Sequence, residues 1–415
     1  MSNMLVISLL SFVCMASHLR TQRNPGSPGV VHGIMWLFVS LGYVFFLGEV
    51  SAFSTQTLLI MMIGIAAFSI GIYFGLEYIW ELHSSHHETP VAYYFPAQIV
   101  LVSAIGLAMM LNKAFQIMPI DQATSWFGSG WSWYTGLRNN LVLSQAKGSF
   151  GFASYVLNFS FAGTAYLILF SRRRYLTPWL WISIVLSLGF ALLSTGRTHL
   201  VLFGCMVVGA AMPATRSNRV VLALFLPLLG AAILFLATFF GGRLTTTSSE
   251  TIIASLVHTQ LKGYILTPVG AFDIFVNSGL PNTWGSMTFR TPLAVLRFLG
   301  IPIEVPEMIQ PNVTFASFLV NVYTVFSPYY RDFGMAGVGL FMGLLGTLHG
   351  WIFRQLKTGM PIIVVANALL FYALFMQFFQ DQYFSLMSQW IQILFWIYLF
   401  NKLQPLPLIV DHDKP

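Results

Sequence analysis

The chain has 415 residues, of which 56% are hydrophobic, 16% aromatic and 8% charged. A soluble core does not need this much apolar surface, so the composition excludes a soluble globular protein and predicts an integral membrane protein. The formal net charge is +7, but the basic residues stand in short clusters at the ends of apolar segments. We therefore interpret them as topology signals and not as a nucleic-acid-binding surface.

Apolar segments of about 17 to 25 residues, the length with which a helix crosses the hydrocarbon layer of a bilayer, recur along the chain. Backbone groups in lipid must bond within the segment, so we predict an all-α polytopic membrane protein with about eleven transmembrane helices. Both cysteines, Cys14 and Cys205, lie inside such segments, which excludes a disulfide framework. The predicted spans are 3–18, 31–48, 55–79, 91–112, 151–170, 177–193, 199–213, 220–240, 334–353, 360–379 and 383–401.

The basic clusters between the spans indicate the orientation, because the side that carries them is the cytoplasm by the positive-inside rule. We expect a retained first helix with the N-terminus outside, since Arg20 and Arg23 follow it. The chain then forms one membrane domain, 1–415, with external loops at 113–150 and 241–333. The clusters are Arg172 to Arg174, Arg216 and Arg219, Arg354 and Lys357, and Lys402.

Residues 312–328 are moderately apolar and would make a twelfth span. A crossing there would move the next basic cluster to the external side, so we interpret this stretch as an interfacial or re-entrant element of the loop. The run that follows is rich in glycine. We expect Gly334, Gly337 and Gly339 to let the next helix pack closely against its neighbours.

The sequence "STGRTH" leaves almost no loop between two spans, because the chain turns at 194–196 and the next span follows at once. Arg197 therefore lies at the external membrane boundary, where its planar fork of donors suits a carboxylate or a phosphate. Gly196 allows close approach of the backbone, and either Thr195 or Thr198 is placed to cap the following helix. The turn has the ingredients of an anion site, with snorkelling of the arginine to the headgroups as the alternative.

Basic residues are not scarce on the external side, although the positive-inside rule would reduce them there. The alternative to a functional role is that long loops translocate regardless of charge.

The sequence contains no convincing cluster of metal ligands, so we predict no metal site. Asp381, between the last two spans, is interpreted as part of a polar turn. The external charged or titratable residues that we consider are Arg138, Arg243, Arg290, Arg331, His258, Glu304, Glu307 and Asp332.

The order of these features resembles a known family. The segment "STGRTHLVL", a basic turn, a large external loop and then "YTVFSPYYRDFGMAGVGLFMGLLGTLHG" closely resemble the bacterial oligosaccharide repeat-unit polymerases of the O-antigen polymerase (Wzy) type. The resemblance extends from about residue 150 to residue 400. It implies a glycosyltransferase that uses a polyprenyl-linked donor, is similar to the GT-C-like enzymes, and works at the periplasmic face of the bacterial inner membrane.

Such an enzyme transfers the growing glycan from undecaprenyl diphosphate to the non-reducing end of a new lipid-linked repeat unit. The departing diphosphate gains charge, which arginines stabilise without a protonation penalty. No metal or other cofactor is expected. The residues predicted to be catalytic are Asp332, Arg331, Glu304 and Glu307, and the general base is open among the three acids and His258. The residues predicted to bind the diphosphate or the sugar are Arg197, Arg138, Arg243, Arg290, Thr198, His199 and Tyr330.

The implied partners are the lipid-linked oligosaccharide, the bilayer, a chain-length-regulating co-polymerase of the Wzz type and a flippase, with no nucleic acid. An O-antigen ligase shares much of the layout and stays open as an alternative. A flippase or transporter also stays open, although the two related halves expected of it are not seen. A purely structural membrane protein would not need arginines concentrated on one face. The pair Arg331 and Asp332 is interpreted either as a loop anchor or as part of the reaction site.

Overall fold

Helices dominate the computed structural model, which describes residues 2–47, 53–80, 94–119, 133, 136–137, 140–141, 150–169, 177–211, 262–263, 265–307 and 310–403. The long helices are α1 (Ser2–Gln22), α2 (Pro28–Leu47), α3 (Thr55–Glu77), α4 (Phe95–Ile117), α6 (Ala153–Leu169), α7 (Thr177–Leu193), α8 (Arg197–Ala211), α13 (Phe326–Gln355), α14 (Pro361–Phe375) and α15 (Met387–Leu403). The smaller elements are α11 (Thr267–Asn277), α12 (Arg290–Phe298), β1 (Val313–Phe315), β2 (Phe318–Val320), and the 3-10 turns η5 (Leu356–Thr358) and η6 (Met376–Phe378).

The helices fall where the apolar segments predicted them. Every predicted span coincides with a helix except 220–240, which lies outside the described residues. Among the described residues, six helices are long and apolar enough to cross a membrane, and three shorter helices, α6, α7 and most of α8, are also apolar. The chain is therefore a mostly helical, polytopic membrane protein.

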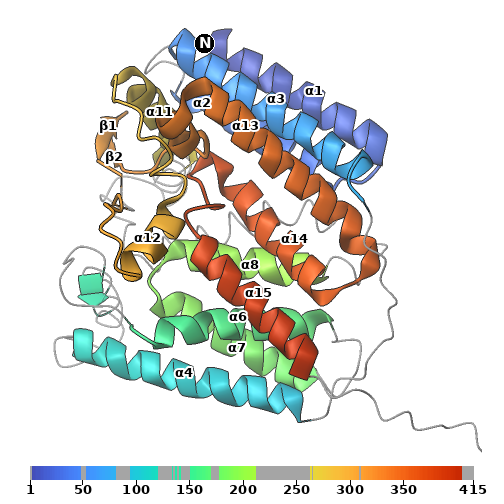
Figure 1. Cartoon of the computed structure of the whole chain (residues 1–415), viewed down its shortest axis with the longest axis vertical. Coiled ribbons are helices and arrows are strands. Elements are labelled where there is room, and N and C mark those ends of the chain that lie inside the picture. The colour runs from blue at the N-terminus through green and yellow to red at the C-terminus, as the bar shows by residue number, and fades with distance from the viewer. Residues whose placement is uncertain are drawn as a thin grey trace, which may run out of the picture.

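The helices form two bundles that α14 joins. In the first bundle α1, α2, α3 and α13 lie side by side, and the second contains α4, α6, α7, α8 and α15 (Figure 1). Leu370 and Leu374 of α14 are buried in the core of the first bundle, whereas Leu369 and Tyr372 are buried in the core of the second. Residues 265–307 and 310–325, here called the cap, contain α11, α12, β1 and β2 and gather at one end of the helices (Figure 1).

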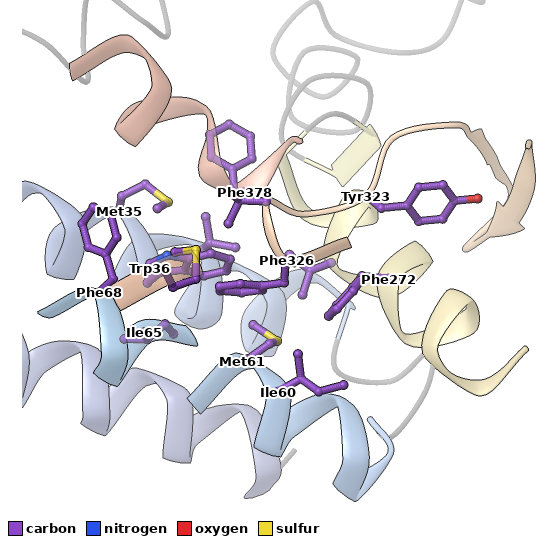
Figure 2. Packing of buried hydrophobic residues seen from close by; sticks show 14 of the residues in the cluster. Met35, Trp36, Ile60, Met61, Ile65, Phe68, Phe272, Tyr323, Phe326 and Phe378 are labelled. Carbon is purple, nitrogen blue, oxygen red and sulfur yellow. The ribbon is translucent and has the colours of Figure 1, made fainter. Parts of the chain in front are cut away.

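The first residues of α13 are buried in the core of the first bundle. The ring of Phe326 stacks on Trp36 of α2 with ring centres 5.2 Å apart, and Phe272 of α11 packs against it at 6.1 Å. Figure 2 shows these rings above Met61 and near Phe68 of α3. The chain therefore enters the bundle interior before α13 begins.

Helix α13 consists of two parts that fold back on each other. Tyr329 stacks on Phe341 with ring centres 5.1 Å apart, although twelve residues of straight helix would separate them by about 18 Å. The bend lies at Gly334, where φ is 65° and ψ is −155°, a combination that is essentially restricted to glycine. The predicted span 334–353 begins at this bend. Residues 326–333 thus form a short re-entrant helix beside the long one.

Two residues of α3 show the direction of the short helix. The ring of Phe326 packs against Gly64, whereas the Tyr330 hydroxyl accepts a hydrogen bond from Gln56 Nε2 at 2.6 Å. Eight residues of α3, about 12 Å, separate those two contacts. Residues 326–333 therefore run from the bundle interior toward the beginning of α3, and the bend places Arg331 at that end.

Glycines bring α3 and α13 into backbone contact. A Cβ added to Gly346 would overlap the carbonyl oxygen of Phe68, and one added to Gly71 would overlap that of Gly343. The expectation of close packing is confirmed for Gly339, where a Cβ would lie 3.3 Å from the side chain of Ile63 on α3. It is corrected for Gly337, where a Cβ would lie 2.6 Å from Tyr329 O within the bent helix itself, and for Gly334, where a Cβ would meet nothing within 4 Å. The backbone contact between α3 and α13 is of the kind that small residues spaced four apart allow between membrane helices.

The stretch 312–328, which we expected to be interfacial or re-entrant, begins as a hairpin and not as a helix. β1 and β2 pair antiparallel, with Phe315 opposite Phe318. The two turn residues, Ala316 and Ser317, both have positive φ, as tight hairpin turns require. Phe315 packs against Gly270, where a Cβ would overlap its ring, so the hairpin is fixed to α11. No twelfth membrane helix forms here.

Candidate functional site

Asp332, next to the bend of α13, is fully buried and holds a loop of the cap. Its Oδ1 accepts hydrogen bonds from the Thr283 hydroxyl at 2.5 Å and the Met287 amide at 3.2 Å, and its Oδ2 accepts one from the Thr288 amide at 2.6 Å. The Thr283 amide in turn donates to the carbonyl of Arg331 at 3.1 Å. The carboxylate thus joins residues 283–288 to the beginning of the membrane helix.

Among the residues that the structure describes, Arg331 has no acidic partner. None of the hydrogen bonds received by Asp332 comes from its guanidinium, so Asp332 does not orient Arg331 by a direct bond, as the loop-anchor interpretation assumed. Within the described part of the chain, nothing accepts a hydrogen bond from the buried Nε of Arg331. The guanidinium carbon lies 5.7 Å from the centre of the Phe275 ring, a cation–π contact. The side chain is half-buried, and its buried Nε is left without an acceptor among the described residues.

The cap is also joined to the beginning of α3. Asp273 of α11 accepts hydrogen bonds at Oδ1 from the Ser54 amide at 3.1 Å and the Ser54 hydroxyl at 2.8 Å. Tyr330 is bonded to Gln56 on the same helix end, which fixes the short helix that carries Arg331. The predicted substrate residue Tyr330 therefore has a structural contact, and its ring is half-buried.

Arg290 begins α12 and is bonded to the cap backbone. Its Nε donates to the carbonyl of Pro306 at 2.8 Å, so the guanidinium lies beside the segment that carries Glu304 and Glu307. Both glutamates are exposed. Since the Thr288 amide bonds Asp332, the cap brings Arg290 into the neighbourhood of the bend.

Asp381 lies in the turn before α15, and its carboxylate is buried there. Its Oδ1 accepts from the Tyr329 hydroxyl at 2.7 Å and the Tyr383 amide at 3.1 Å, and its Oδ2 accepts from the amides of Phe384 and Ser385, both at 3.1 Å. Burial raises the pKa of Asp381, while these hydrogen bonds act in the opposite direction. The carboxylate joins the short helix of α13 to the turn that precedes α15.

The turn at 194–196 forms between α7 and α8 as the sequence predicts. Thr195 has a φ of 54°, and the Ser194 hydroxyl lies 3.0 Å from Nδ1 of His199, whose ring is half-buried. Helix α8 begins at Arg197, one or two residues earlier than expected, and Thr198 follows inside it. The side chain of Arg197 lies outside what the structure describes, as do Arg138, Arg243 and His258.

The predicted residues thus form separate groups. Arg331, Asp332 and Tyr330 share the short helix, and Arg290 with the two glutamates lies on the adjoining part of the cap. Within the described ranges, no contact joins either group to the turn at 194–196. The same ranges contain no group of three or more His, Cys, Asp or Glu residues placed to hold a metal ion.

Sequence reasoning missed three residues that build the site: Asp273, Thr283 and Tyr329. Asp273 carried a signal, because a single acid within the apolar run "GAFDIF" needs a polar partner when the run is buried. Thr283 and Tyr329 carried none, since their partners are 49 and 52 residues away in the chain.

Fold and site together define a polytopic helical membrane protein in which a cap positions an arginine over one end of a helix bundle, with no acidic partner for it in the described part of the chain. The chain is similar to an O-antigen polymerase of Shigella dysenteriae, with 24% identity over 354 residues, which cover 84% of this chain and 78% of the relative. This similarity confirms the resemblance to O-antigen polymerases that the motifs indicated. No family model matches the chain, and no solved structure matches it significantly.

Proposed function

We propose that the chain is an O-antigen or polysaccharide repeat-unit polymerase. It transfers the growing glycan from undecaprenyl diphosphate to the non-reducing end of a new lipid-linked repeat unit, at the periplasmic face of the bacterial inner membrane. The observation that carries the proposal is the similarity to an O-antigen polymerase along 84% of the chain. The lipid-linked oligosaccharide and the bilayer are the implied partners, together with a Wzz-type co-polymerase and a flippase.

The chemistry assigns the diphosphate to Arg331. A glycosyl transfer from undecaprenyl diphosphate leaves negative charge on the departing phosphate, which a fixed, partly desolvated guanidinium stabilises. The support is that Asp332 is bonded to the cap and leaves the neighbouring cation free. Arg290 lies near the bend and adds a second positive charge. Arg197, Arg138 and Arg243 stay proposed contacts of the same anion.

For the general base we propose Glu304 or Glu307. Three donors surround the carboxylate of Asp332, which suits a residue that holds a loop and not one that exchanges a proton with a sugar hydroxyl. Both glutamates are exposed and therefore accessible to an acceptor. In this scheme Asp332 acts on the reaction by positioning Arg331.

A deletion strain tests the proposed function. Loss of a polymerase leaves surface glycan with a single repeat unit on a gel, and the wild-type gene restores the ladder. Complete loss of the attached glycan would instead identify a ligase. Accumulation of the lipid-linked intermediate at the cytoplasmic face would identify a flippase.

We also propose that the transfer needs no divalent metal, because arginines supply the positive charge at the diphosphate. Purified protein in nanodiscs, supplied with lipid-linked repeat units, should extend them equally with and without excess EDTA. A magnesium-dependent glycosyltransferase assayed in parallel shows that the chelator is effective. Activity that disappears with EDTA and returns with magnesium or manganese would refute metal independence without affecting the assignment as a polymerase.

A further inference from the structure

Helix α12 turns an apolar face away from the protein. None of its nine residues is buried, and the exposed fraction reaches 89% for Phe298 and 53% for Val295. The next residues continue this face, with Leu299 exposed at 68% and Ile301 also exposed. Contiguous apolar surface of this kind marks a binding surface and not a surface in contact with water.

Polar bonds fix this orientation. On the inner side, Arg290 Nε donates to the carbonyl of Pro306 at 2.8 Å, and the Thr291 hydroxyl donates to the carbonyl of Phe384 at 3.3 Å. Leu293 and Leu296 are half-buried on the same side. The cap therefore holds α12 with its valine and phenylalanine outward, and the apolar face does not result from a loosely attached helix.

The surroundings of α12 identify what covers it. Phe384 lies in the turn before α15, and Ile391 and Phe395 of α15 are exposed on that apolar helix, as lipid-facing residues are. The helix itself contains Arg290 and Arg297 and no acid, which complements anionic headgroups. Nine residues span about 14 Å, too short to cross the hydrocarbon layer, so the helix suits the surface of the bilayer and not its interior.

We propose that α12 and the residues up to Ile301 are a membrane-surface anchor, whose apolar face inserts into the headgroup region of the leaflet next to the cap. The outward phenylalanine and leucine enter the acyl boundary, and Arg297 remains among the phosphates. Since residues 283–288 join Asp332 to α12, the anchor holds the bend of α13 at headgroup depth. This inference concerns the bilayer and does not depend on the proposed reaction.

Fluorescence in nanodiscs tests the anchor with the full-length protein. Cys14 and Cys205 are replaced by alanine, and Phe298→Cys or Val295→Cys is labelled with the environment-sensitive dye NBD, in nanodiscs of phosphatidylethanolamine and phosphatidylglycerol. We expect a blue-shifted emission at both positions and strong quenching by lipids that carry a doxyl group near the headgroup. Asn312→Cys, an exposed polar position of the cap, is the matched control and should show water-like emission with quenching by iodide.

Two results would overturn the proposal. Water-like emission at both α12 positions, with iodide quenching equal to that at the control position, would mean that the face is exposed to solvent. Shielding from iodide and from doxyl lipid alike would mean that protein covers it. Using two labelled positions guards against a single substitution that disturbs the helix.

Discussion

At the bend of α13 two adjacent residues of opposite charge have separate structural roles. Asp332 receives three hydrogen bonds from the cap, and Arg331 packs on Phe275 with no acidic partner among the residues that the structure describes. A carboxylate bonded to the guanidinium would have neutralised the charge that a diphosphate needs. The separation of the two side chains therefore supports an anion at Arg331, with the position of that residue set by its neighbour.

Arg331 is tested with variants that separate its charge from its packing. Arg331→Met keeps much of the length and apolar character of the side chain and removes the charge, and it should lower polymerisation by about 100-fold, the usual loss when one fixed donor to a developing negative charge is removed. Arg331→Lys should recover only part of the rate, because an ammonium cannot bind in a bidentate fashion. The rate of glycan extension by purified protein is the measurement. Lys402→Ala, in the last turn of α15, is the control, and full activity of Arg331→Met would contradict the assignment.

Asp332→Asn should destabilise the cap. Whichever oxygen becomes the amide nitrogen, its N–H groups face a backbone amide that can only donate, that of Met287 at Oδ1 or that of Thr288 at Oδ2. Hydrogen bonds to a charged group contribute about 1.5–3 kcal/mol, so the melting temperature in detergent should fall clearly. Thr283→Val should lower it less, and Glu304→Gln, an exposed position, should leave it unchanged. Unchanged melting of Asp332→Asn together with a complete loss of polymerisation would instead make Asp332 the general base.

At the scale of elements, glycines decide how α3 and α13 pack and how α13 bends. Gly71 and Gly346 bring the two backbones into contact, whereas Gly334 provides the positive φ of the bend. The same glycine-rich sequence thus serves two purposes that its spacing does not distinguish. As a result, the short helix with Arg331 lies beside the long helix and not at the end of a straight one.

Gly346→Ala and Gly343→Ala form a matched pair for the packing of α3 on α13. An added Cβ at Gly346 would overlap the carbonyl of Phe68, whereas an added Cβ at Gly343 would lie 3.9 Å from Ala67 O, an ordinary van der Waals contact. Overpacking typically costs about 1–3 kcal/mol, so Gly346→Ala should unfold at a distinctly lower temperature. Gly343→Ala should melt close to wild type, because alanine favours a helix. Equal melting of the two variants would show that the helices are not in backbone contact.

At the scale of the molecule, hydrogen bonds place the cap and a basic cluster at opposite ends of the first bundle. Asp273 and Tyr330 join the cap side to the beginning of α3, whereas Arg354 donates to the carbonyl of Leu76, near the end of that helix. By the positive-inside rule, we expect the end with Arg354 to be cytoplasmic and the cap to face the periplasm.

Cysteine labelling tests this orientation. Ser317→Cys, in the turn of the cap hairpin, should react with a membrane-impermeant maleimide on intact spheroplasts. Lys402→Cys, at the end of α15, should react only after permeabilisation, since the predicted spans put the C-terminus inside. The parent protein without Cys14 and Cys205 is the control. Equal labelling of both positions before permeabilisation would refute the topology.

Much of the fold was predictable because lipid imposes a length and a composition on each crossing helix. The described helices therefore lie within a few residues of the apolar segments, and the turn at 194–196 follows from the few residues between two of them. The resemblance to O-antigen polymerases was also visible in short motifs, and the similarity to the Shigella dysenteriae protein confirmed it. Each of these features depends only on residues that are close together in the sequence, so it can be read from the sequence alone.

Only the tertiary structure decided how the charged residues are used. The sequence places Arg331 beside Asp332, but the hydrogen-bond donors to that aspartate come from a loop more than forty residues earlier in the chain. Likewise, the carboxylate of Asp381 accepts a hydrogen bond from the hydroxyl of Tyr329, and the rest of α13 and all of α14 lie between these two residues in the sequence. The sequence also shows several glycines, but it does not indicate which of them contacts the backbone of a neighbouring helix. Contacts between distant segments depend on how the helices pack, and neither hydropathy nor local spacing contains that information.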